Sequence, residues 1–414
     1  MQEIFPLNKR KIINDPVHGF IKIPYDIIYD LIEHPFFQRL RRITQLGMTS
    51  YVYPGANHTR FQHAIGAMHL MGNAIDVIRS KGHKITDEEA EAVTIAILLH
   101  DIGHGPYSHS LEHSLMKGVE HEEISLMIME LLNEFFDHRL DLAIRIFRND
   151  YHKKFLHQLV SSQLDMDRLD YLKRDSFFTG VTEGVIGSDR IIKMLQVHDD
   201  ELVVEEKGIY SIEKFLVARR LMYWQVYLHK SVIAADQLLI MMLKRARILA
   251  SQHVVLNVSS PLEYFLYEQG GELNSKNQEE FVIQFAALDD NDIISAAKLW
   301  SRHEDRFLSI ICKSFLSRKL PRIEIQDVAF EEEKINRLRR QVATQFSLSV
   351  KDAEQMVITD SVSNNAYSAL DDNIKILGKH GKLRDISEAS DILNVSVLSK
   401  TVRKFFLCYP KNLQ

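Results

Sequence analysis

The segment from Thr86 to Leu99 constrains the fold of this chain more than any other. Thr86 is followed three positions later by Glu89, a capping-box pattern that predicts the start of a helix. The residues from Ala92 to Leu99 are apolar on nearly every side of that helix. A helix that is apolar all round is buried, so this one is predicted to be central. The glycines and the proline of 103–106 are predicted to end it.

Helical periodicity recurs along the chain, and the pattern changes after about residue 270. Further helices are predicted at 25–33, 35–44, 63–80, 122–133, 140–148, 153–173 and 212–251. Short strands are predicted at 202–206, 322–326, 357–362 and 395–398. The predicted fold class is mainly α, with a helical core over residues 1–270 and a smaller α+β region over 271–414. We expect the second region to serve oligomerisation or regulation.

Composition excludes several classes of protein. The net charge is −5 and the pI is near 6.4, so no global field attracts nucleic acid or an anionic membrane. The two cysteines, Cys312 and Cys408, exclude a disulfide framework and a thiolate zinc site, and they fit a reducing compartment. The N-terminus shows no signal-type apolar run, and no stretch reaches the roughly 20 apolar residues that span a bilayer. We therefore expect a cytoplasmic protein without a membrane partner.

His100 and Asp101 follow the predicted central helix directly. Polar side chains at the end of so apolar a segment must face a polar cavity or incur a large desolvation penalty. A His-Asp pair is common and in isolation means little, but four more histidines follow closely. They are His104, His109, His113 and His121. Imidazoles and carboxylates that converge on rigid elements suit hard metal ions. Satisfied core histidines explain such a cluster poorly.

Two further ligands are expected from other helices. His63 opens the predicted helix at 63–80, and Asp167 lies in an acidic segment where Gln163, Asp167 and Tyr171 are predicted to share one helix face. The alternative for Asp165, Asp167, Asp170 and Asp175 is a solvated acidic face paired with nearby basic residues. Taken alone, that segment favours the alternative.

Ordered motifs carry a resemblance to a known family. His63, His100-Asp101 and Asp167 follow the H…HD…D order of the HD superfamily of metal phosphohydrolases. Segments 14–19, 38–41, 45–47, 58–63 and 100–109 resemble its dNTP triphosphohydrolases, namely the vertebrate SAM-and-HD-domain enzyme and its bacterial relatives. The similarity covers roughly residues 10–260 well and the remainder loosely, and we expect no SAM domain in this chain.

The resemblance implies a metal site and an acid–base group beside it. The metal ligands would be His63, His100, Asp101 and Asp167. The ion, which would be Mn, Fe, Mg, Co or Zn, would polarise a phosphoryl oxygen and lower the pKa of a bound water. The catalytic residues would be His104, His109, His121 and Glu122. Among these, His109 would protonate the leaving 5′-oxygen, and Glu122 would orient His121. His113 has no counterpart and is expected to be structural.

The resemblance also implies a set of substrate contacts. They would be Gln45, Leu46, Arg60, Arg168, Tyr171, Asp175, Arg219, Tyr223 and Tyr227. Arg60 and Arg219 would bind phosphates, and Tyr227 would exclude a ribose 2′-hydroxyl. Tyr223 departs from the family, which has a histidine there, and this puts the sugar or base preference in doubt. Without the resemblance, Arg60 is a surface cation, and Tyr223 with Tyr227 is a core aromatic stripe.

An effector site is suggested less directly. Residues that match the activator positions of the vertebrate enzyme are Lys11, Glu33, Gln38, Arg41, Arg318 and Arg322. Glu33 replaces an aspartate, and the extra methylene would weaken a guanine contact. The alternative for all six residues is a set of surface salt bridges.

We therefore expect metal-dependent hydrolysis of dNTPs to deoxynucleoside and inorganic triphosphate. The resemblance implies a homo-oligomer (dimer or tetramer) and suggests a nucleotide activator, and the sequence leaves open whether an activator is required. A second hypothesis keeps the metal chemistry but acts on a monophosphate, cyclic or signalling nucleotide. The cations Arg60, Arg219 and Lys230 favour a polyphosphate. A third hypothesis is a nucleic-acid-binding protein with a vestigial site, which the acidic net charge disfavours.

Overall fold

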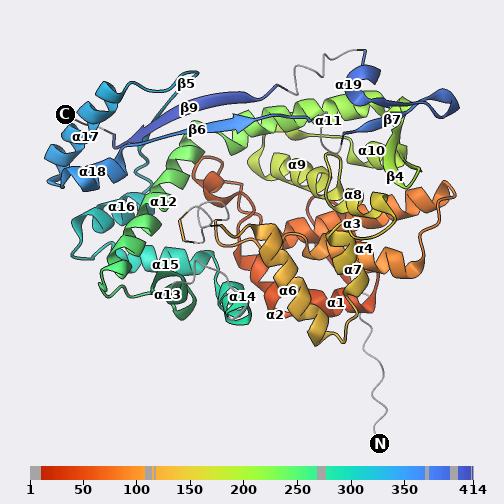
Figure 1. Ribbon diagram of the computed structural model, residues 1–414, viewed down its shortest axis with the longest axis horizontal. Coiled ribbons are helices and arrows are strands. Elements are labelled where there is room, and N and C mark those ends of the chain that lie inside the picture. Colours follow the sequence, from red (N-terminus) through yellow and green to blue (C-terminus); the bar gives the residue numbers. More distant parts are fainter. Residues whose placement is uncertain are drawn as a thin grey trace, which may run out of the picture.

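The predicted central helix is present in the computed structural model as α4 (Asp87–Leu99) (Figure 1). Its capping box forms as expected. The Thr86 hydroxyl accepts a hydrogen bond from the backbone N–H of Glu89 at 3.1 Å, and the Glu89 carboxylate accepts one from the N–H of Thr86 at 2.8 Å. All residues from Ala92 to Leu99 are buried. Helix α3 (Arg60–Ser80) packs against both α4 and α9 (Met166–Thr179), and these three helices position the candidate site.

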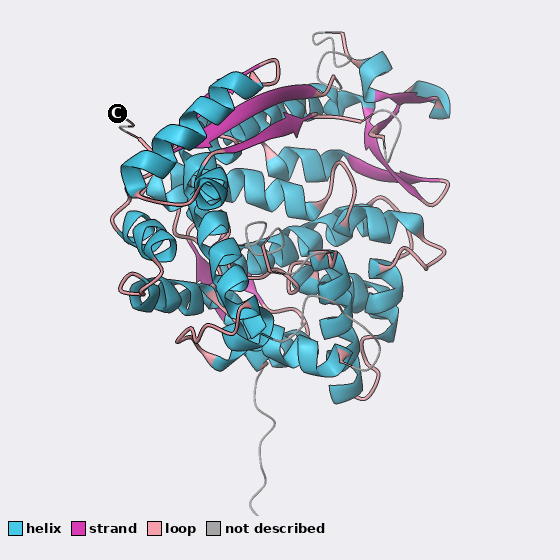
Figure 2. Cartoon of the chain, turned by 60° about the vertical axis from the view of Figure 1, so that its left-hand side comes forward, coloured by secondary structure: helices cyan, strands magenta, loops and turns pink. Residues whose placement is uncertain are grey.

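The structure describes residues 11–107, 114–115, 118–267, 277–368, 373–391, 400–411 and 413. Helices make up most of these residues, as Figure 2 shows, which confirms the mainly α prediction. The other helices before residue 200 are α1 (Asp26–Glu33), α2 (Pro35–Gln38), α6 (His121–Phe135), α7 (Asp141–Phe147), α8 (Lys154–Val160) and α10 (Ser188–Met194). The later helices are α11 (Ile209–Met222), α12 (Lys230–Ser251), α13 (Ser260–Tyr267), α14 (Gln278–Ala287), α15 (Asp290–Trp300), α16 (Arg306–Leu316), α17 (Glu332–Phe346), α18 (Val350–Met356) and α19 (Ile386–Ala389).

The strands form three small sheets among the described residues. A hairpin joins β1 (Ile12–Asp15) to β2 (Gly19–Lys22). A second sheet has the order β3-β4-β7-β8, with β3 (Leu195–His198), β4 (Glu201–Glu205), β7 (Lys375–Leu377) and β8 (Leu383–Asp385). In the third, β9 (Val402–Tyr409) lies between β5 (Arg322–Gln326) and β6 (Ile358–Asn364), antiparallel to both. This third sheet runs along one edge of the molecule in Figure 1.

The strand predictions at 202–206, 322–326 and 357–362 are confirmed by β4, β5 and β6, within one or two residues. The predicted strand at 395–398 lies outside the described residues. The parallel pairing of β4 with β7 adds late strands to a sheet that begins before residue 270. The division of the chain at residue 270 stays a prediction.

The prediction of one continuous helix at 153–173 is wrong. Helix α8 ends at Val160, and α9 begins at Met166. Asp165 causes the break, because its carboxylate accepts hydrogen bonds from the backbone N–H groups of Ser162 (2.8 Å) and Arg168 (2.7 Å). An aspartate with that role is an N-cap. Gln163 therefore lies before α9, and its predicted place on one helix face with Asp167 is also wrong.

Two other predicted helices are interrupted. The helix expected at 212–251 divides into α11 and α12, with a π-helical turn at Tyr223–Tyr227 between them. The imidazole of His229 then caps α12 by accepting from the N–H of Ser231. The helix expected at 35–44 becomes α2 followed by a 3₁₀ turn, Arg39–Arg42. A 3₁₀ or π-helical turn changes the direction in which the following side chains point. Both interruptions lie beside the candidate site.

Within the described ranges, no single helix is long and apolar enough to cross a membrane. The pair Glu206–Tyr227 and Lys230–Ser251 passes that test only when the two segments are taken together, and they meet at a bend of 55°.

Gly66 is required where α3 crosses α9. A Cβ atom added there would lie 2.1 Å from an Asp170 carboxylate oxygen and 2.2 Å from a guanidinium nitrogen of Arg174. We predict that Gly66→Ala lowers the free energy of unfolding by about 1–3 kcal/mol, because the buried Asp170 and Arg174 side chains must move. Urea denaturation measures the loss.

Gly72 provides the matched control on the same helix. No atom lies within 4 Å of a Cβ built at Gly72. Gly72→Ala should therefore leave the protein as stable or add up to about 1 kcal/mol, since alanine favours the helix. Equal stabilities for the two variants would contradict the packing argument.

Candidate metal site and the cleft beside it

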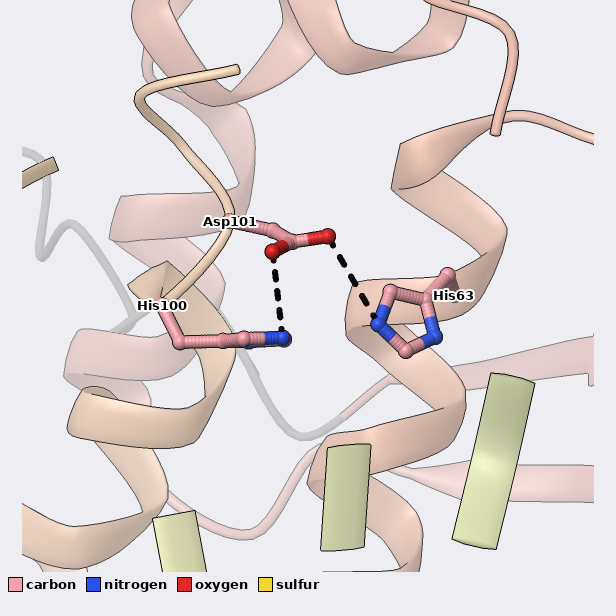
Figure 3. Close-up of side chains that lie close together, drawn as sticks. All are labelled: His63, His100 and Asp101. Carbon is pink, nitrogen blue, oxygen red and sulfur yellow. Dashed lines mark ion pairs between the residues drawn. The ribbon is translucent and has the colours of Figure 1, made fainter. Parts of the chain in front are cut away.

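Four metal-type ligands from three helices converge. His63 lies in the first turn of α3, His100 and Asp101 follow α4 directly, and Asp167 lies in the first turn of α9. Ligand atoms of His63, His100 and Asp101 all lie within 4.8 Å of one another, and Figure 3 shows these side chains pointing toward a common space. An Asp167 oxygen lies 3.0 Å from Nε2 of His63 and 3.5 Å from Nε2 of His100.

The two imidazoles are oriented to offer Nε2. Nδ1 of His63 lies 2.8 Å from an Asp170 oxygen, and Nδ1 of His100 lies 2.6 Å from the carbonyl oxygen of Ile97. Both Nε2 atoms are buried, and within the described part of the chain neither has a hydrogen bond of good geometry. Metal-binding histidines are commonly fixed in this way through the other nitrogen. Two such nitrogens with two carboxylates therefore fit a divalent metal ion.

Charge coupling in this cluster is strong. Burial lowers the pKa of His63, but the adjacent carboxylates of Asp167 and Asp170 outweigh it and raise the pKa to about 10. Burial also opposes ionisation of Asp101, yet His100 and Arg60 hold its pKa well below the usual range. Without a metal, His63 is thus protonated at neutral pH, and a metal ion must displace that proton.

Asp170 holds the His63 ring in place through its contact with Nδ1. Its carboxylate is fully buried and accepts hydrogen bonds from Nε2 of His18 at 2.7 Å and from Arg174 at 2.8 and 3.0 Å. Arg174 also donates to Asp15 at 2.7 Å. The β1–β2 hairpin, which brings Asp15 and His18, is thereby tied to α3 and α9.

Arg39 fixes the turn that follows His100-Asp101. Its buried guanidinium donates to the carbonyl oxygens of Ile102 (2.8 Å) and His104 (2.9 Å). From the other side, the N–H of Gly103 donates to the Ser125 hydroxyl, which itself donates to the carbonyl oxygen of His100. The backbone after α4 is therefore held on both sides.

Two adjoining cavities extend from the cluster. The metal-side cavity has a volume of about 530 Å³ and includes His100, Asp101 and Asp167 in its lining. The tyrosine-side cavity has about 520 Å³ and includes Tyr227 and Asp175. Four residues line both: Gln45, Arg60, Tyr171 and Tyr223. The shared lining makes the two cavities one elongated cleft, with the metal cluster at one end.

Two arginines, Arg60 and Arg168, line the metal end of the cleft, and Arg219 lies near Tyr171. Arg60 pairs with Asp101, and Arg168 lies 3.4 Å from Asp165. Among the described residues, Nε of Arg168, and Nε and one terminal nitrogen of Arg219, are buried without a hydrogen-bond partner. Buried donors are normally hydrogen-bonded, and a guanidinium pairs well with phosphate oxygens, so these arginines suit phosphate groups.

Histidines also line the metal end. The rings of His104 and His121 are stacked with centroids 3.9 Å apart, and Nε2 of His121 lies 3.2 Å from Glu122. Burial and the charge of Arg60 lower the pKa of His104 to about 3. His104 is therefore neutral at pH 7 and suits hydrogen bonding rather than donation from an imidazolium.

The tyrosines form the middle of the cleft. Tyr227 packs edge-on against Tyr171 and Tyr223, with centroids 6.3 and 5.1 Å away. Its hydroxyl donates to Asp175 at 2.7 Å, and the other Asp175 oxygen pairs with His58 at 2.8 Å. Because Tyr223 and Tyr227 line a cavity, they are not the core stripe that the bare pattern suggested.

Family models match most of the chain. An HD domain matches residues 60–175, and an HD-associated region matches residues 186–403, which is more than half of the chain. The chain belongs to the HD-domain phosphohydrolase family. The HD match contains the whole ligand cluster, and the second match contains the late strands that close the cleft.

Individual relatives agree with this assignment. A crystal structure of a phosphohydrolase from Bacteroides thetaiotaomicron is 54% identical, with a TM-score of 0.93 over 97% of this chain and 100% of that one. An uncharacterized protein of Bacillus subtilis, YwfO, is 30% identical over 98% of this chain and 94% of its own length. A Dictyostelium discoideum protein, named as a deoxynucleoside triphosphate triphosphohydrolase SAMHD1 homolog, is 35% identical over 53% of this chain. This chain spans less than half (46%) of that relative.

Most predicted site residues of this HD-domain protein lie along the cleft. The cleft lining includes Gln45, Leu46, Arg60, His100, Asp101, His104, His121, Glu122, Asp167, Arg168, Tyr171, Asp175, Tyr223 and Tyr227. His63 completes the ligand cluster from the side, and Arg219 lies close enough to Tyr171 to influence its pKa. His109 and His113 lie outside the described residues.

The predicted effector residues are placed elsewhere. Arg318 donates to the carbonyl oxygen of Tyr51, and Arg322 lies on β5 beside Glu324. Arg41 donates to Gln38 and covers the ring of Phe61. These contacts are those of surface pairs, and an effector role stays a prediction, as it does for Lys11 and Glu33.

The residues behind the ligands are missing from the sequence-based site. His18, His58, Asp170 and Arg174 are buried and join the ligands to the hairpin and to α9. The solvated acidic face proposed as an alternative is wrong, because Asp165, Asp170 and Asp175 are at most 1% exposed. The only local signal was that His18 and His58 lie inside two of the recognised motifs.

Replacing Asp170 should weaken metal binding without removing a ligand. Asp170→Asn removes the charge that orients His63, and we predict a loss of about 10–100-fold in Mn²⁺ affinity by calorimetry. Asp175→Asn is the control, since Asp175 is equally buried on α9 but contacts His58 and Tyr227 instead. Equal affinities in the two variants would refute the positioning role. Circular dichroism verifies that both remain folded.

The raised pKa of His63 predicts a pH dependence of opposite sign with and without metal. In EDTA, the stability from protonated His63 is fully present below about pH 6.5 and is lost as the pH rises toward 10. Metal binding needs the deprotonated ring, so the stabilisation by Mn²⁺ should grow over the same window. Thermal unfolding between pH 6.5 and 9 tests both trends.

His63→Gln is the control for that scan, because it removes the titrating group. The variant should lose the decline in EDTA. A metal-induced stabilisation of the wild-type protein that shrinks as the pH rises would contradict this assignment.

Proposed function

We propose that this protein hydrolyses deoxynucleoside triphosphates to deoxynucleosides and inorganic triphosphate. The observation that carries the proposal is the elongated cleft. A metal-type cluster with Arg60 and Arg168 occupies one end, and a tyrosine pair beside a buried aspartate occupies the middle. The Dictyostelium relative, which bears the name of this activity, supports the same assignment.

The reaction joins a water oxygen to the α-phosphorus and breaks the bond from that phosphorus to the 5′-oxygen. His63, His100, Asp101 and Asp167 would hold a metal ion, which would supply Lewis acidity and lower the pKa of a water. Arg60, Arg168 and Arg219 bind phosphate oxygens and neutralise their charge. A proton must reach the leaving 5′-oxygen. We assign its delivery to an active-site histidine. His121 is held by Glu122 at the metal end, and the family resemblance makes His109 the predicted donor.

The middle of the cleft suits a deoxyribose. Asp175 already accepts a hydrogen bond from Tyr227, so it is placed to accept one from a sugar hydroxyl as well. The family resemblance gives Tyr227, which lines this part of the cleft, the role of excluding a ribose 2′-hydroxyl. Three arginines are more than a monophosphate requires, which favours a triphosphate over the monophosphate and cyclic substrates. Oligomerisation and nucleotide activation stay expectations of the family resemblance.

Product analysis tests this function. The protein is incubated with each dNTP and Mn²⁺, with and without GTP, and the products are separated by anion-exchange chromatography. We expect triphosphate and deoxynucleoside in equal amounts. Asp101→Asn should lower the rate by at least about a thousandfold, because the metal loses a ligand worth several kcal/mol of transition-state stabilisation.

The control for charge is Asp199→Asn, whose carboxylate is 89% exposed at the β3–β4 turn. It should retain the wild-type rate. Orthophosphate or pyrophosphate in place of triphosphate would overturn the proposed reaction. Hydrolysis that survives Asp101→Asn would show that another site is responsible.

A further inference from the structure

Asp290, the first residue of α15, connects two segments that line the cleft. It belongs to the part of the chain that matches the HD-associated region, and its side chain is buried. One carboxylate oxygen accepts hydrogen bonds from the backbone N–H and the hydroxyl of Thr44, both at 2.9 Å. The other oxygen accepts one from the backbone N–H of Tyr107 at 3.2 Å. A single side chain outside the HD match thus holds two separate segments of the site.

The first of these segments carries substrate-side groups. Thr44 directly precedes Gln45, which lines both cavities of the cleft. The same segment pairs with the chain that enters α3, because the N–H of Arg60 donates to the carbonyl oxygen of Ile43 and the N–H of Gln45 donates to that of His58, each at 3.0 Å. The grip of Asp290 on Thr44 therefore extends to the backbone of Arg60.

The second segment is the turn that follows His100-Asp101. It ends at Tyr107, which lines the tyrosine-side cavity with a φ of +50°, a value that residues with a side chain rarely adopt unless their surroundings hold them. Asp290 supplies that constraint at the Tyr107 N–H. Arg39 ties the start of the same turn to the residues before α15, since it donates to the carbonyl oxygens of Leu288 and His104.

The chemistry of a carboxylate suits this double attachment. An ionised carboxylate presents acceptors on both oxygens, whereas an amide or a protonated carboxyl group presents a donor on one side. With donors at Thr44 and at Tyr107, a neutral replacement of the same shape satisfies one segment and opposes the other. Both segments are held together by Asp290 when it is an anion.

The surroundings of Asp290 compensate this charge poorly. The charged and titratable groups around it are Asp289 on its own helix, Arg39 and Arg42 on the 3₁₀ turn, and the phenols of Tyr107 and Tyr51. Arg42 pairs with Asp289, and no ion pair between described residues includes Asp290. Burial raises the pKa of Asp290 to about 6, although the hydrogen bonds from Thr44 and Tyr107 oppose that rise. The ionised form present at neutral pH therefore lowers the stability of the fold.

We propose that Asp290 is a positioning residue for hydrolysis in the cleft. It fixes the Gln45–Arg60 side of the cleft relative to the Tyr107 side, and it acts through Thr44 and the Tyr107 backbone. The expected effect on rate rests on the proposed function, whereas the attachment of the two segments does not.

Hydrogen exchange measured by mass spectrometry tests the attachment without any substrate. In Asp290→Asn the amide oxygen serves one segment, so the N–H of Thr44 or of Tyr107 loses its acceptor. Its exchange should become about 10–100-fold faster, the usual effect of a lost hydrogen bond to a charged group. Asp289→Asn is the matched control. Asp289 caps α15 by accepting from the N–H of Asn291, a role that asparagine fills equally well, and this variant should leave both amides protected.

Kinetics and stability measured together test the positioning role. We expect kcat/KM for triphosphate release by Asp290→Asn to fall about 10–100-fold, because a small displacement of the groups around a substrate is enough for such a loss. Mn²⁺ affinity should stay within about twofold of the wild-type value, since every metal ligand remains. The Tm at pH 7.5 should be equal to or higher than that of the wild-type protein, because a buried charge is removed.

The pH dependence of the Tm supplies a further sign. The pKa of Asp290 is higher in the folded than in the unfolded chain, so its contribution to stability is present at low pH and is lost as the pH rises through about 6. The advantage of Asp290→Asn over the wild-type protein should therefore shrink as the pH falls from 7.5 to 5. The Tm of Asp289→Asn should show no such trend relative to the wild-type protein.

Three results would overturn the role of Asp290. One is unchanged exchange at both amides in Asp290→Asn. Another is an equal loss of protection or of rate in Asp289→Asn. The third is a fall in rate that a lower Tm and weaker Mn²⁺ binding accompany, which would show a general loss of structure. A wild-type protein that releases no triphosphate would instead refute the proposed reaction, while hydrogen exchange still decides whether Asp290 holds the two segments.

Discussion

The buried carboxylate of Asp170 is the constraint on which the rest of the site depends. An anion without exposure to water is costly unless charged partners surround it. Its partners His18, His63 and Arg174 come from the β1–β2 hairpin, α3 and α9. These elements must therefore dock in one arrangement. That arrangement turns Nε2 of His63 toward His100 and Asp101, so the geometry of the ligand cluster follows from burying Asp170.

Much of the fold and the ligand set could be predicted because their signals are local. The capping box at Thr86 and Glu89 and the apolar run that follows define α4 without reference to any other segment. The H…HD…D order then selects His63, His100-Asp101 and Asp167 from a chain with many other histidines and carboxylates. Each of these inferences uses either spacing within one helix or a motif whose residues are close in sequence.

The rest depends on contacts between distant residues. His18 and Asp170 are 152 positions apart, so their pairing leaves no trace in local periodicity. The sequence around Asp165 predicts a helix that continues through it, because only the folded structure shows that its carboxylate caps α9. The break at Tyr223–Tyr227 is similar. Its sequence suits a continuous helix, and the π-helical turn is what brings Tyr223 and Tyr227 to the cleft.

The late strands β6 and β9 line the tyrosine-side cavity of the cleft. The HD match supplies the ligands, Arg60, Arg168 and Tyr171, whereas Arg219, Tyr223 and Tyr227 lie in the HD-associated region. Helix α12 and strand β6 line the same cavity as Tyr227, through residues such as Ile233 and Val362. The HD-associated region is thus more than a support for the helical core, because part of it faces whatever enters the cleft.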